Sequence, residues 1–364
     1  SSAASDVYKR QAIGNELNVD GETVRNWFIK QPYYFNLPRN AFVIRNSKSS
    51  NPHIISYPSY FSPQFSEFLA MLIAESDSYF SPTTFYIRFH NKNPLLLDYF
   101  SYLCKKLFNL KTFSGSRKVE FRRVNSISLG KFLEGLNVCV GKRAREKDIP
   151  EILLRADLEN IKSFLRMYFE LDGSVSKRGV ELTSASKEII NKIAYLLLRF
   201  GIVCRIKKKI VKGKEYWRLI ISSTEFTKKF YENIGFISKE KNEKLRNLIL
   251  KEHTNVDIIP FSNLFLRNYR EKLKLSRKEF YGSKKLGEIY EKKNLSRKKL
   301  QEIVTKKGIN GLIKKLAFSD VFWDKVIEIE VKDYEGYVYD ICVPKNHTFI
   351  AGFGGIVCHN TALA

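Results

Sequence analysis

The sequence is short of cysteine, of long apolar runs and of acidic residues. Its five cysteines form no CxxC pair, which argues against a zinc site or a disulfide framework and favours a reducing cytoplasm. The longest apolar runs, such as 68–74 and 193–198, are far too short to cross a bilayer. No hydrophobic signal segment opens the chain. We therefore expect a cytoplasmic protein with no membrane partner.

The shortage of acids leaves a strong positive charge. The 364 residues include 63 Lys and Arg against 38 Asp and Glu, a formal net charge of +25. Apolar residues make up 44% and aromatic residues 13%, which is enough for packed cores and excludes disorder throughout. So large an excess of positive charge in a folded chain indicates a polyanionic partner, and we expect nucleic acid.

The chain length favours two or three domains, and the local patterns divide it further. Residues 12–31 predict two short helices around a turn at 18–21, with Arg25 on the helix that would enter a DNA groove. An ordinary helical hairpin is the alternative. The predicted segments are a cloning scar (1–11), a helix-turn-helix (12–31), a linker with short strands (32–63), a duplicated domain (64–240), a basic helical linker or subdomain (241–317), a β-rich C-terminal region (318–360) and a four-residue tail (361–364).

A helix-strand-strand-helix pattern occurs twice, which predicts an α+β domain with pseudo-two-fold symmetry. The first unit comprises an apolar helix at 64–74, a strand at 85–89 and an amphipathic helix at 95–108; the second comprises a helix at 157–171, strands at 180–183, 206–210 and 216–222, and a helix at 187–200. From Val326 the apolar residues recur with period two, which predicts a β tail with strands near 326–329, 338–343 and 348–351.

Each apolar helix stops at a carboxylate followed by a small residue. In the second unit the acid is Asp172, followed by Gly173; in the first it is Glu75 or Asp77, each followed by a serine. If Glu75 is aligned with Asp172, small residues of one helix lie opposite large residues of the other. If Asp77 is aligned with Asp172 instead, the residues that follow the two acids match. We prefer Glu75 and keep Asp77 as the alternative. Two such ionised acids can bind hard divalent cations that assist phosphodiester hydrolysis.

The motifs Phe68-Leu-Ala-Met-Leu-Ile-Ala-Glu-Ser76 and Leu165-Arg-Met-Tyr-Phe-Glu-Leu-Asp-Gly173 resemble those of the LAGLIDADG homing endonucleases, over roughly residues 64–240. The resemblance implies a double-stranded DNA substrate, Glu75 and Asp172 as Mg²⁺ ligands, and catalytic carboxylates at Glu75 or Asp77 and at Asp172. The first motif has serine where the family has glycine. The family's strands form a saddle over the duplex, so DNA contacts are expected at Arg88, Arg122, Arg123, Arg205, Lys207, Lys209 and Arg218.

The C-terminal segment ends in His359-Asn360-Thr361 and holds two of the five histidines. An asparagine amide can attack its own backbone carbonyl, which closes a succinimide and breaks the bond to the next residue. A neighbouring histidine can protonate the leaving amine or polarise the carbonyl. A hydroxyl after the asparagine can first accept an acyl group. The residues thus predict autocatalytic cleavage before Thr361.

This segment, together with the lead-in Ser319-Asp-Val-Phe-Trp-Asp-Lys-Val326, resembles the C-terminal splicing region of archaeal inteins, which has the Hint fold. The resemblance implies that Asn360 cyclises, His359 assists, His347 orients or accepts a proton, Asp340 is an acid near the junction and Thr361 is the acyl acceptor. Splicing needs no cofactor. No Thr is followed three residues later by His, and residues 1–11, interpreted as a cloning scar, offer no credible Cys or Ser start. A separate N-terminal intein half is therefore an expected partner.

The tail Thr361-Ala-Leu-Ala364 resembles the residues that come after the lysine of a phosphate-binding loop, Gly-x-x-x-x-Gly-Lys-[Ser/Thr]. A P-loop ATPase is therefore the expected host. We interpret the sequence as an intein fragment carrying a site-specific DNA endonuclease. The alternatives are a decayed LAGLIDADG and helix-turn-helix regulator that cuts nothing, and a free-standing nuclease. The His-Asn-Thr ending argues against both, since neither has a use for it.

Overall fold

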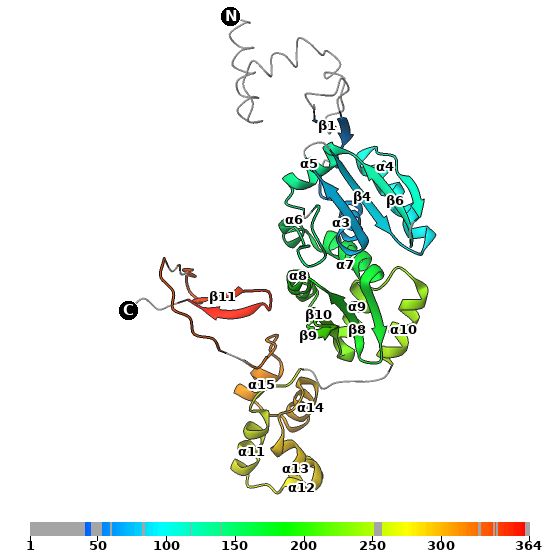
Figure 1. Ribbon diagram of the computed structural model, residues 1–364. Coiled ribbons are helices and arrows are strands. Elements are labelled where there is room, and N and C mark those ends of the chain that lie inside the picture. The colour runs from blue at the N-terminus through cyan, green and yellow to red at the C-terminus, as the bar shows by residue number, and fades with distance from the viewer. Residues whose placement is uncertain are drawn as a thin grey trace, which may run out of the picture. The chain divides into compact units, whose positions relative to one another are not determined.

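The computed structural model, shown in Figure 1, describes residues 41–44, 53–58, 60–81, 84–116, 118–138, 140–250, 257–326, 329–337, 339 and 341–360. The helix-turn-helix expected at 12–31, with Arg25, lies outside these residues, as do Asp340 and Thr361. The chain divides into two compact units, residues 1–164 and 165–364, and each is described by itself.

The first repeat packs two helices against a four-stranded antiparallel sheet with the order β3-β4-β6-β5. Phe68, Phe89 and Phe100 are fully buried between these layers. A two-stranded sheet precedes the repeat, as expected for the linker, and two helices follow it. The elements are β1 (Ala41–Ile44), β2 (His53–Ser56), α3 (Pro63–Glu75), β3 (Ser76–Phe80), β4 (Phe85–His90), α4 (Pro94–Phe108), β5 (Phe113–Ser116), β6 (Glu120–Asn125), α5 (Ile127–Gly135) and α6 (Glu151–Leu154).

Helix α3 begins and ends where its residues dictate. The Ser62 hydroxyl accepts a hydrogen bond from the Phe65 amide at 3.2 Å, and Pro63 occupies the first turn, where no amide hydrogen is needed. Most of its residues are buried, so the helix is apolar on several faces. Helix and strand are contiguous, since Glu75 ends α3 and Ser76 begins β3.

The second repeat has the same topology, with the sheet order β7-β8-β10-β9. The predicted helix-strand-strand-helix duplication is confirmed, and both repeats add a second pair of strands. Helix α10 packs on α9 and β7, so this fold extends beyond the expected boundary at 240. The elements are α7 (Leu158–Asp172), β7 (Gly173–Ser176), β8 (Gly179–Ser184), α8 (Lys187–Leu198), β9 (Arg205–Val211), β10 (Lys214–Ile221), α9 (Thr224–Asn233) and α10 (Lys239–Ile249).

The basic segment that comes next is helical, as expected, and has a core of its own. Buried residues of this core include Ile259, Leu266, Phe280, Leu300 and Val304. It therefore forms a small helical unit. Its helices are α11 (Ser262–Lys272), α12 (Arg277–Tyr281), α13 (Lys284–Lys292), α14 (Arg297–Lys307) and α15 (Leu312–Ala317).

The C-terminal region contains one antiparallel hairpin, β11 (Thr348–Ala351) with β12 (Ile356–His359). The strand expected at 348–351 is confirmed. Those expected near 326–329 and 338–343 are wrong for the residues described there, which form no strand. Their apolar side chains are exposed, Ile329 by 81% and Tyr339 by 88%. A lone segment has no neighbouring backbone to satisfy its amides and carbonyls, so alternation alone does not produce a strand.

The helices of the described ranges are too short or too polar to cross a bilayer. Within those ranges, none meets both the length and the apolar character that a membrane span requires.

Candidate functional sites

The two motif helices end in the same way. Glu75 is the last residue of α3 and Asp172 is the last residue of α7, and a strand begins at the next residue in both repeats. Asp77, the alternative first acid, lies two residues further on, within β3. By secondary structure, Glu75 is therefore the counterpart of Asp172.

A lysine covers the end of each motif helix, and the sequence patterns did not point to either. The ammonium group of Lys147 donates to the carbonyl oxygens of Ile73 at 2.8 Å and Ser76 at 2.6 Å. In the second repeat the Lys241 ammonium donates to the carbonyl oxygens of Glu170 and of Gly173, the latter at 2.9 Å.

These lysines fix the alignment of the two repeats independently of the helix bounds. In each repeat the accepting carbonyls lie two residues before and one residue after the helix-end acid, Glu75 or Asp172. The lysines also follow at similar distances along the chain, 71 residues after Ser76 and 68 after Gly173. That repeated spacing is the sequence signal that could have identified Lys147 and Lys241.

A carboxylate at a helix C-terminus works against the helix dipole, whose negative end lies there. Such a placement costs on the order of 0.3–1 kcal/mol, and it is made twice, at Glu75 and Asp172. The ammonium groups of Lys147 and Lys241 offset this cost because they bind carbonyls in the last turns of α3 and α7. Residues that are unfavourable for folding, and are then compensated, indicate a site shaped by chemistry.

The two acids have different polar neighbours. The Asn91 side-chain amide donates a hydrogen bond to the Glu75 carboxylate. In the second repeat the fully buried Tyr168, one helical turn before Asp172, donates its hydroxyl to the Asp172 carboxylate. Burial raises the pKa of Tyr168 well above its usual value, and the charge of Asp172 raises it further. Tyr168 therefore keeps its proton and stays a hydrogen-bond donor to the Asp172 carboxylate.

Asp77 is occupied within the first sheet. Its carboxylate binds the Arg88 guanidinium, with Nε at 3.0 Å, and the His90 Nε2 at 2.6 Å. Burial alone would raise the pKa of Asp77, but the hydrogen bonds from Arg88 and His90 outweigh it and lower the pKa. The contacts of Asp77 are those of a cross-strand ion pair between β3 and β4.

The serine that replaces glycine in the first motif is accommodated by its neighbours. A Cβ added at Gly173 would lie 2.5 Å from the Phe169 carbonyl oxygen, so the second repeat needs glycine there. At the matching position, buried Ser76 donates its hydroxyl to the Met71 carbonyl at 2.9 Å. The substitution thus leaves the helix end intact.

The groups at each helix end suit a hard divalent cation by their chemistry. Each end offers a carboxylate, which is an oxygen ligand of the kind that Mg²⁺ prefers. Within the part of the chain that the structure describes, no cluster of three or more His, Cys, Asp or Glu could hold a metal. Water and a phosphate would therefore have to supply most ligands, as is usual for Mg²⁺.

The second sheet carries a basic surface centred on β9, which is exposed along its whole length. Lys207 lies opposite Arg218 and Arg205 opposite Ile220, so the expected DNA contacts of this repeat share one sheet. The Arg218 Nε and the Ser222 hydroxyl oxygen are buried without a hydrogen-bond partner. A hollow of about 680 Å³ is lined by Lys177, Arg178, Arg205, Lys207, Lys208, Lys209, Arg218, Ile220 and Ser222.

The three arginines expected on the first sheet also lie together, but each has a partner there. Arg88 binds Asp77, the Arg122 Nη2 lies 3.1 Å from the Asp98 Oδ1, and the Arg123 Nε donates to the Asn125 side chain at 2.6 Å. Arg88 and Arg123 are directly opposite each other on β4 and β6. In the second sheet Arg218 lies 3.8 Å from the Glu181 carboxylate and Lys208 pairs with Glu215, so the two sheets differ mainly at the exposed strand β9.

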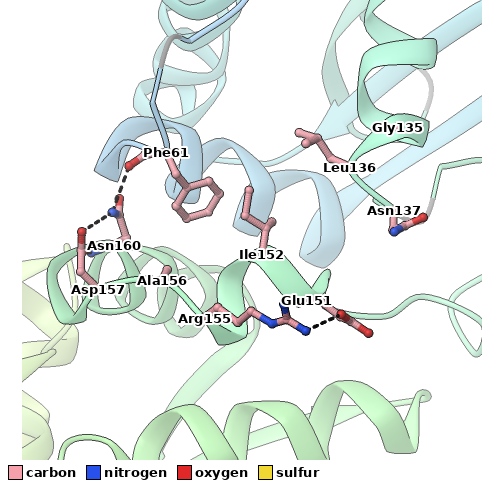
Figure 2. A pocket seen from close by; sticks show the side chains of 10 residues that line it. All are labelled: Phe61, Gly135, Leu136, Asn137, Glu151, Ile152, Arg155, Ala156, Asp157 and Asn160. Carbon is pink, nitrogen blue, oxygen red and sulfur yellow. Dashed lines mark hydrogen bonds and ion pairs between the residues drawn. The ribbon is translucent and has the colours of Figure 1, made fainter. Parts of the chain in front are cut away.

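A further hollow of about 500 Å³ lies beside the start of α7 (Figure 2). Its polar groups bind one another. The Asn160 side-chain nitrogen donates to the Phe61 carbonyl at 3.0 Å and to the Asp157 carboxylate at 2.9 Å, and the Ser66 hydroxyl donates to the Asn160 Oδ1 at 3.3 Å. These bonds attach the first turn of α7 to α3, which is a structural role.

The C-terminal hairpin gathers three of the expected splicing residues. The Asn360 amide donates to the His347 carbonyl at 2.8 Å, directly after the Thr348–His359 pair. The rings of His347 and His359 lie 5.9 Å apart between centroids. Asn360 is only 7% exposed, and its side-chain oxygen is buried without a hydrogen-bond partner.

The His359 ring contacts the carbonyl that asparagine cyclisation would attack. Its Nδ1 lies 2.6 Å from the backbone oxygen of Asn360. In the tautomer that carries its proton on Nδ1, His359 donates to this oxygen and polarises the carbonyl. The exposed Cys342 and the partly exposed Cys358 are free thiols.

Comparison with known proteins identifies one part of the chain. Residues 159–235 match the family model of the LAGLIDADG-like domain, so the chain contains a LAGLIDADG-like domain. The crystal structure of the homing endonuclease I-DmoI with DNA and Mn aligns with 48% of this chain and 98% of its own. The sequence identity is 14% and the TM-score 0.39, which is too low to define a fold.

Curated relatives match more of the chain. The DNA-directed RNA polymerase subunit Rpo1C of Methanocaldococcus jannaschii is 32% identical over 82% of this chain and 35% of its own length. The replication factor C small subunit of the same organism is 31% identical over 69% of this chain and 13% of its own. Elongation factor 2 of Methanopyrus kandleri is 30% identical over 61% and 18%. The chain thus spans about a third or less of these relatives.

Proposed function

We propose that the chain is part of an intein that carries a metal-dependent, site-specific DNA endonuclease. The observation that carries the endonuclease is the duplicated helix end, where a carboxylate and a lysine occur at matching positions in both repeats. One such end has an ordinary structural explanation. Two with the same unfavourable carboxylate and the same compensating lysine are better explained by shared chemistry.

The relatives support an element that is inserted into unrelated hosts. An RNA polymerase subunit, a replication factor subunit and an elongation factor share no activity by name, yet each matches most of this chain over a minor part of its own length. The shared segment is therefore separate from the functions that the names describe. This is what a self-splicing insertion predicts.

In the proposed nuclease, Glu75 and Asp172 each supply a carboxylate ligand to Mg²⁺. The bound cation would stabilise charge on the oxygens that attack and leave phosphorus. Lys147 and Lys241 hold the helix ends and place positive charge beside the scissile phosphate. The cations of the second sheet bind the duplex through its phosphates.

In the proposed splicing step, the Asn360 side-chain nitrogen attacks the Asn360 backbone carbonyl carbon. The bond from that carbon to the Thr361 nitrogen breaks, a succinimide closes and the amine takes up a proton. His359 stabilises the carbonyl oxygen through Nδ1. The Thr361 hydroxyl would have accepted the upstream acyl chain beforehand, and Asp340 would lie close to this junction. Cys342 and Cys358 are assigned no catalytic role.

The splicing proposal is tested with a matching N-terminal intein half supplied in trans. Mass spectrometry should detect a peptide released by cleavage between Asn360 and Thr361. The Asn360→Ala variant, which has no amide nucleophile, should release none, while Cys358→Ala should release it normally. Cleavage that persists in Asn360→Ala would refute cyclisation.

The rival function is a regulator that binds DNA and cuts nothing. Both functions predict binding that weakens with salt, so cutting decides between them. The substrate is a duplex that spans the uninterrupted insertion junction of the host gene. A product formed with Mg²⁺ and not with EDTA supports the nuclease, and binding without any product favours the regulator. The host itself is expected to be a P-loop ATPase whose upstream segment ends in Gly-Lys.

A further inference from the structure

The helical unit at 257–317 is strongly basic, and the proposed nuclease and splicing sites use none of it. It contains 17 Lys and Arg against 6 Asp and Glu. Its buried residues form a separate core. Positive charge concentrated on a compact unit requires an explanation besides packing, because like charges repel one another and lower stability.

Helices α12 and α13 are joined by a tight turn. α12 ends at Tyr281 and is capped by Gly282, which has a left-handed φ of 79°. Ser283 caps α13, its hydroxyl accepting from the Leu286 amide at 3.4 Å. Two helices joined by a short turn that contains glycine are the arrangement of a helix-turn-helix. In that motif the second helix is the one that enters a DNA groove.

The two helices also cross closely. Gly287, inside α13, is buried, and an added Cβ would lie 2.8 Å from both the Arg277 Cβ and the Tyr281 Cδ2. Glycine within a helix costs roughly 1 kcal/mol relative to alanine. Close contact with α12 explains why this position has no side chain, and it fixes the orientation of α13 on α12.

A buried acid, Glu291, holds the C-terminal end of α13 in place. The Glu291 carboxylate binds the Arg270 Nε at 2.6 Å and the Arg277 Nε at 2.8 Å. Burial alone would raise the pKa of Glu291, but its hydrogen bonds to Arg270 and Arg277 lower it, so it stays ionised. These contacts tie α13 to α11 and α12, and they account for two of the arginines in the unit.

The outward face of α13 combines positive charge with exposed apolar side chains. Lys285, Ile289 and Lys292 follow the spacing of one helical face, and all three are exposed. Leu286 beside them is 42% exposed and Ile289 is 47% exposed. Lysines bind phosphates, whereas exposed aliphatic groups contact thymine methyls in the major groove. Lysine alone would be explained by solvation, but its combination with Leu286 and Ile289 favours duplex DNA.

We propose that α13 is the groove-binding helix of a helix-turn-helix in residues 257–317, and that its partner is duplex DNA. Helix α13 would contact DNA in addition to the basic surface centred on β9. The inference builds on the proposed function only in assigning the same ligand, DNA, to a second surface of the same chain. It does not require that the chain cuts.

The test measures binding of the full chain to a fluorescent duplex of mixed sequence, about four helical turns long, over a range of KCl concentrations. Lys285→Glu with Lys292→Glu should weaken binding at least tenfold and lower the salt slope by about two, because each phosphate contact contributes roughly 0.9. The control, Lys306→Glu with Lys315→Glu, makes the same charge change on α14 and α15, where both lysines are exposed. It should weaken binding less than threefold. Equal losses in both variants would overturn the proposal.

A second measurement does not depend on these substitutions. A photo-crosslinking residue at position 289 should form an adduct with the duplex, and one at position 306 should form none. An adduct that single-stranded RNA of equal length suppresses as well as duplex DNA would refute the choice of partner. If the chain cuts DNA while the α13 variants bind normally, this inference fails and the nuclease stands. If the α13 variants lose binding in a chain that never cuts, this inference stands and the nuclease fails.

Discussion

The two repeats match in the groups proposed for catalysis and differ in the charged groups proposed to set DNA affinity. Both end their motif helix in a carboxylate and cover it with a lysine. The first sheet, however, pairs its arginines with acids such as Asp77 and Asp98, whereas the second exposes the basic strand β9. In the proposed nuclease, catalysis requires the same geometry in both repeats, whereas DNA binding requires only total positive charge, which would explain why the helix ends match and the sheets differ.

The largest expected effect comes from the helix-end acids. Asp172→Asn and Glu75→Gln should each lower the rate of Mg²⁺-dependent DNA cutting about a thousandfold, on the order of 4 kcal/mol, because each removes a charged metal ligand. Binding of the duplex should stay within a fewfold of wild type. Asp77→Asn is the matched control, and it should keep cutting. Loss of DNA cutting in Asp77→Asn, together with normal cutting in Glu75→Gln, would reverse the assignment of the first acid.

The lysines should show the next largest effect, and it should be the same in both repeats. Lys147→Met and Lys241→Met should each slow cutting by about tenfold to a hundredfold, since each removes a positive charge beside the site. Lys162→Met, on the exposed surface of α7, is the control and should cut at the normal rate. Single-turnover rates on the junction duplex provide the measurement. If only one repeat needs its lysine, the lysines do not have equivalent roles.

The sheets of the two repeats should contribute unequally to DNA affinity. Replacing Arg205, Lys207 and Lys209 with alanine should lower the salt slope of binding by about two to three. The equivalent change at Arg88, Arg122 and Arg123 should lower it by about one, because these side chains already bind groups of their own repeat. Fluorescence titrations at several salt concentrations measure both slopes. Equal slopes would show that the pairing of the first sheet does not limit its DNA contacts.

The smallest effect concerns stability and pH. The folded-state pKa of Asp77 is lowered below its usual value of 3.8, so its ion pair contributes stability above that pH. This contribution is lost as the pH falls through the lowered folded-state pKa. Asp77→Asn should therefore reduce Tm at neutral pH and should change it less in acid near that pKa. Because the Asp77 side chain is 45% exposed, solvent screening keeps the effect small. An equal change at both pH values would exclude the ion pair as its cause.

Sequence patterns predicted the features that depend on local periodicity and spacing. Helix ends at Glu75 and Asp172, the duplicated topology and the strand β11 follow from apolar runs, acids and alternation in the order of the chain. The contacts of Lys147 and Lys241 were not predicted, because they join residues about seventy positions apart. The same holds for Tyr168, whose hydroxyl could as well have pointed elsewhere in the core.

The strand predictions that were wrong have one physical cause. Apolar residues alternate near 326–329 and 338–343, yet the residues described there form no strand. Alternation predicts one buried face, but a strand also needs a neighbour for its backbone groups.

The central claim is that Glu75 and Asp172 bind the catalytic cation. Calorimetric titration of Mn²⁺ into the full chain bound to the junction duplex tests it most directly. Wild type and Asp77→Asn should show saturable binding, while Glu75→Gln and Asp172→Asn should each lose at least one site. Unchanged Mn²⁺ binding in both Glu75→Gln and Asp172→Asn would contradict the claim.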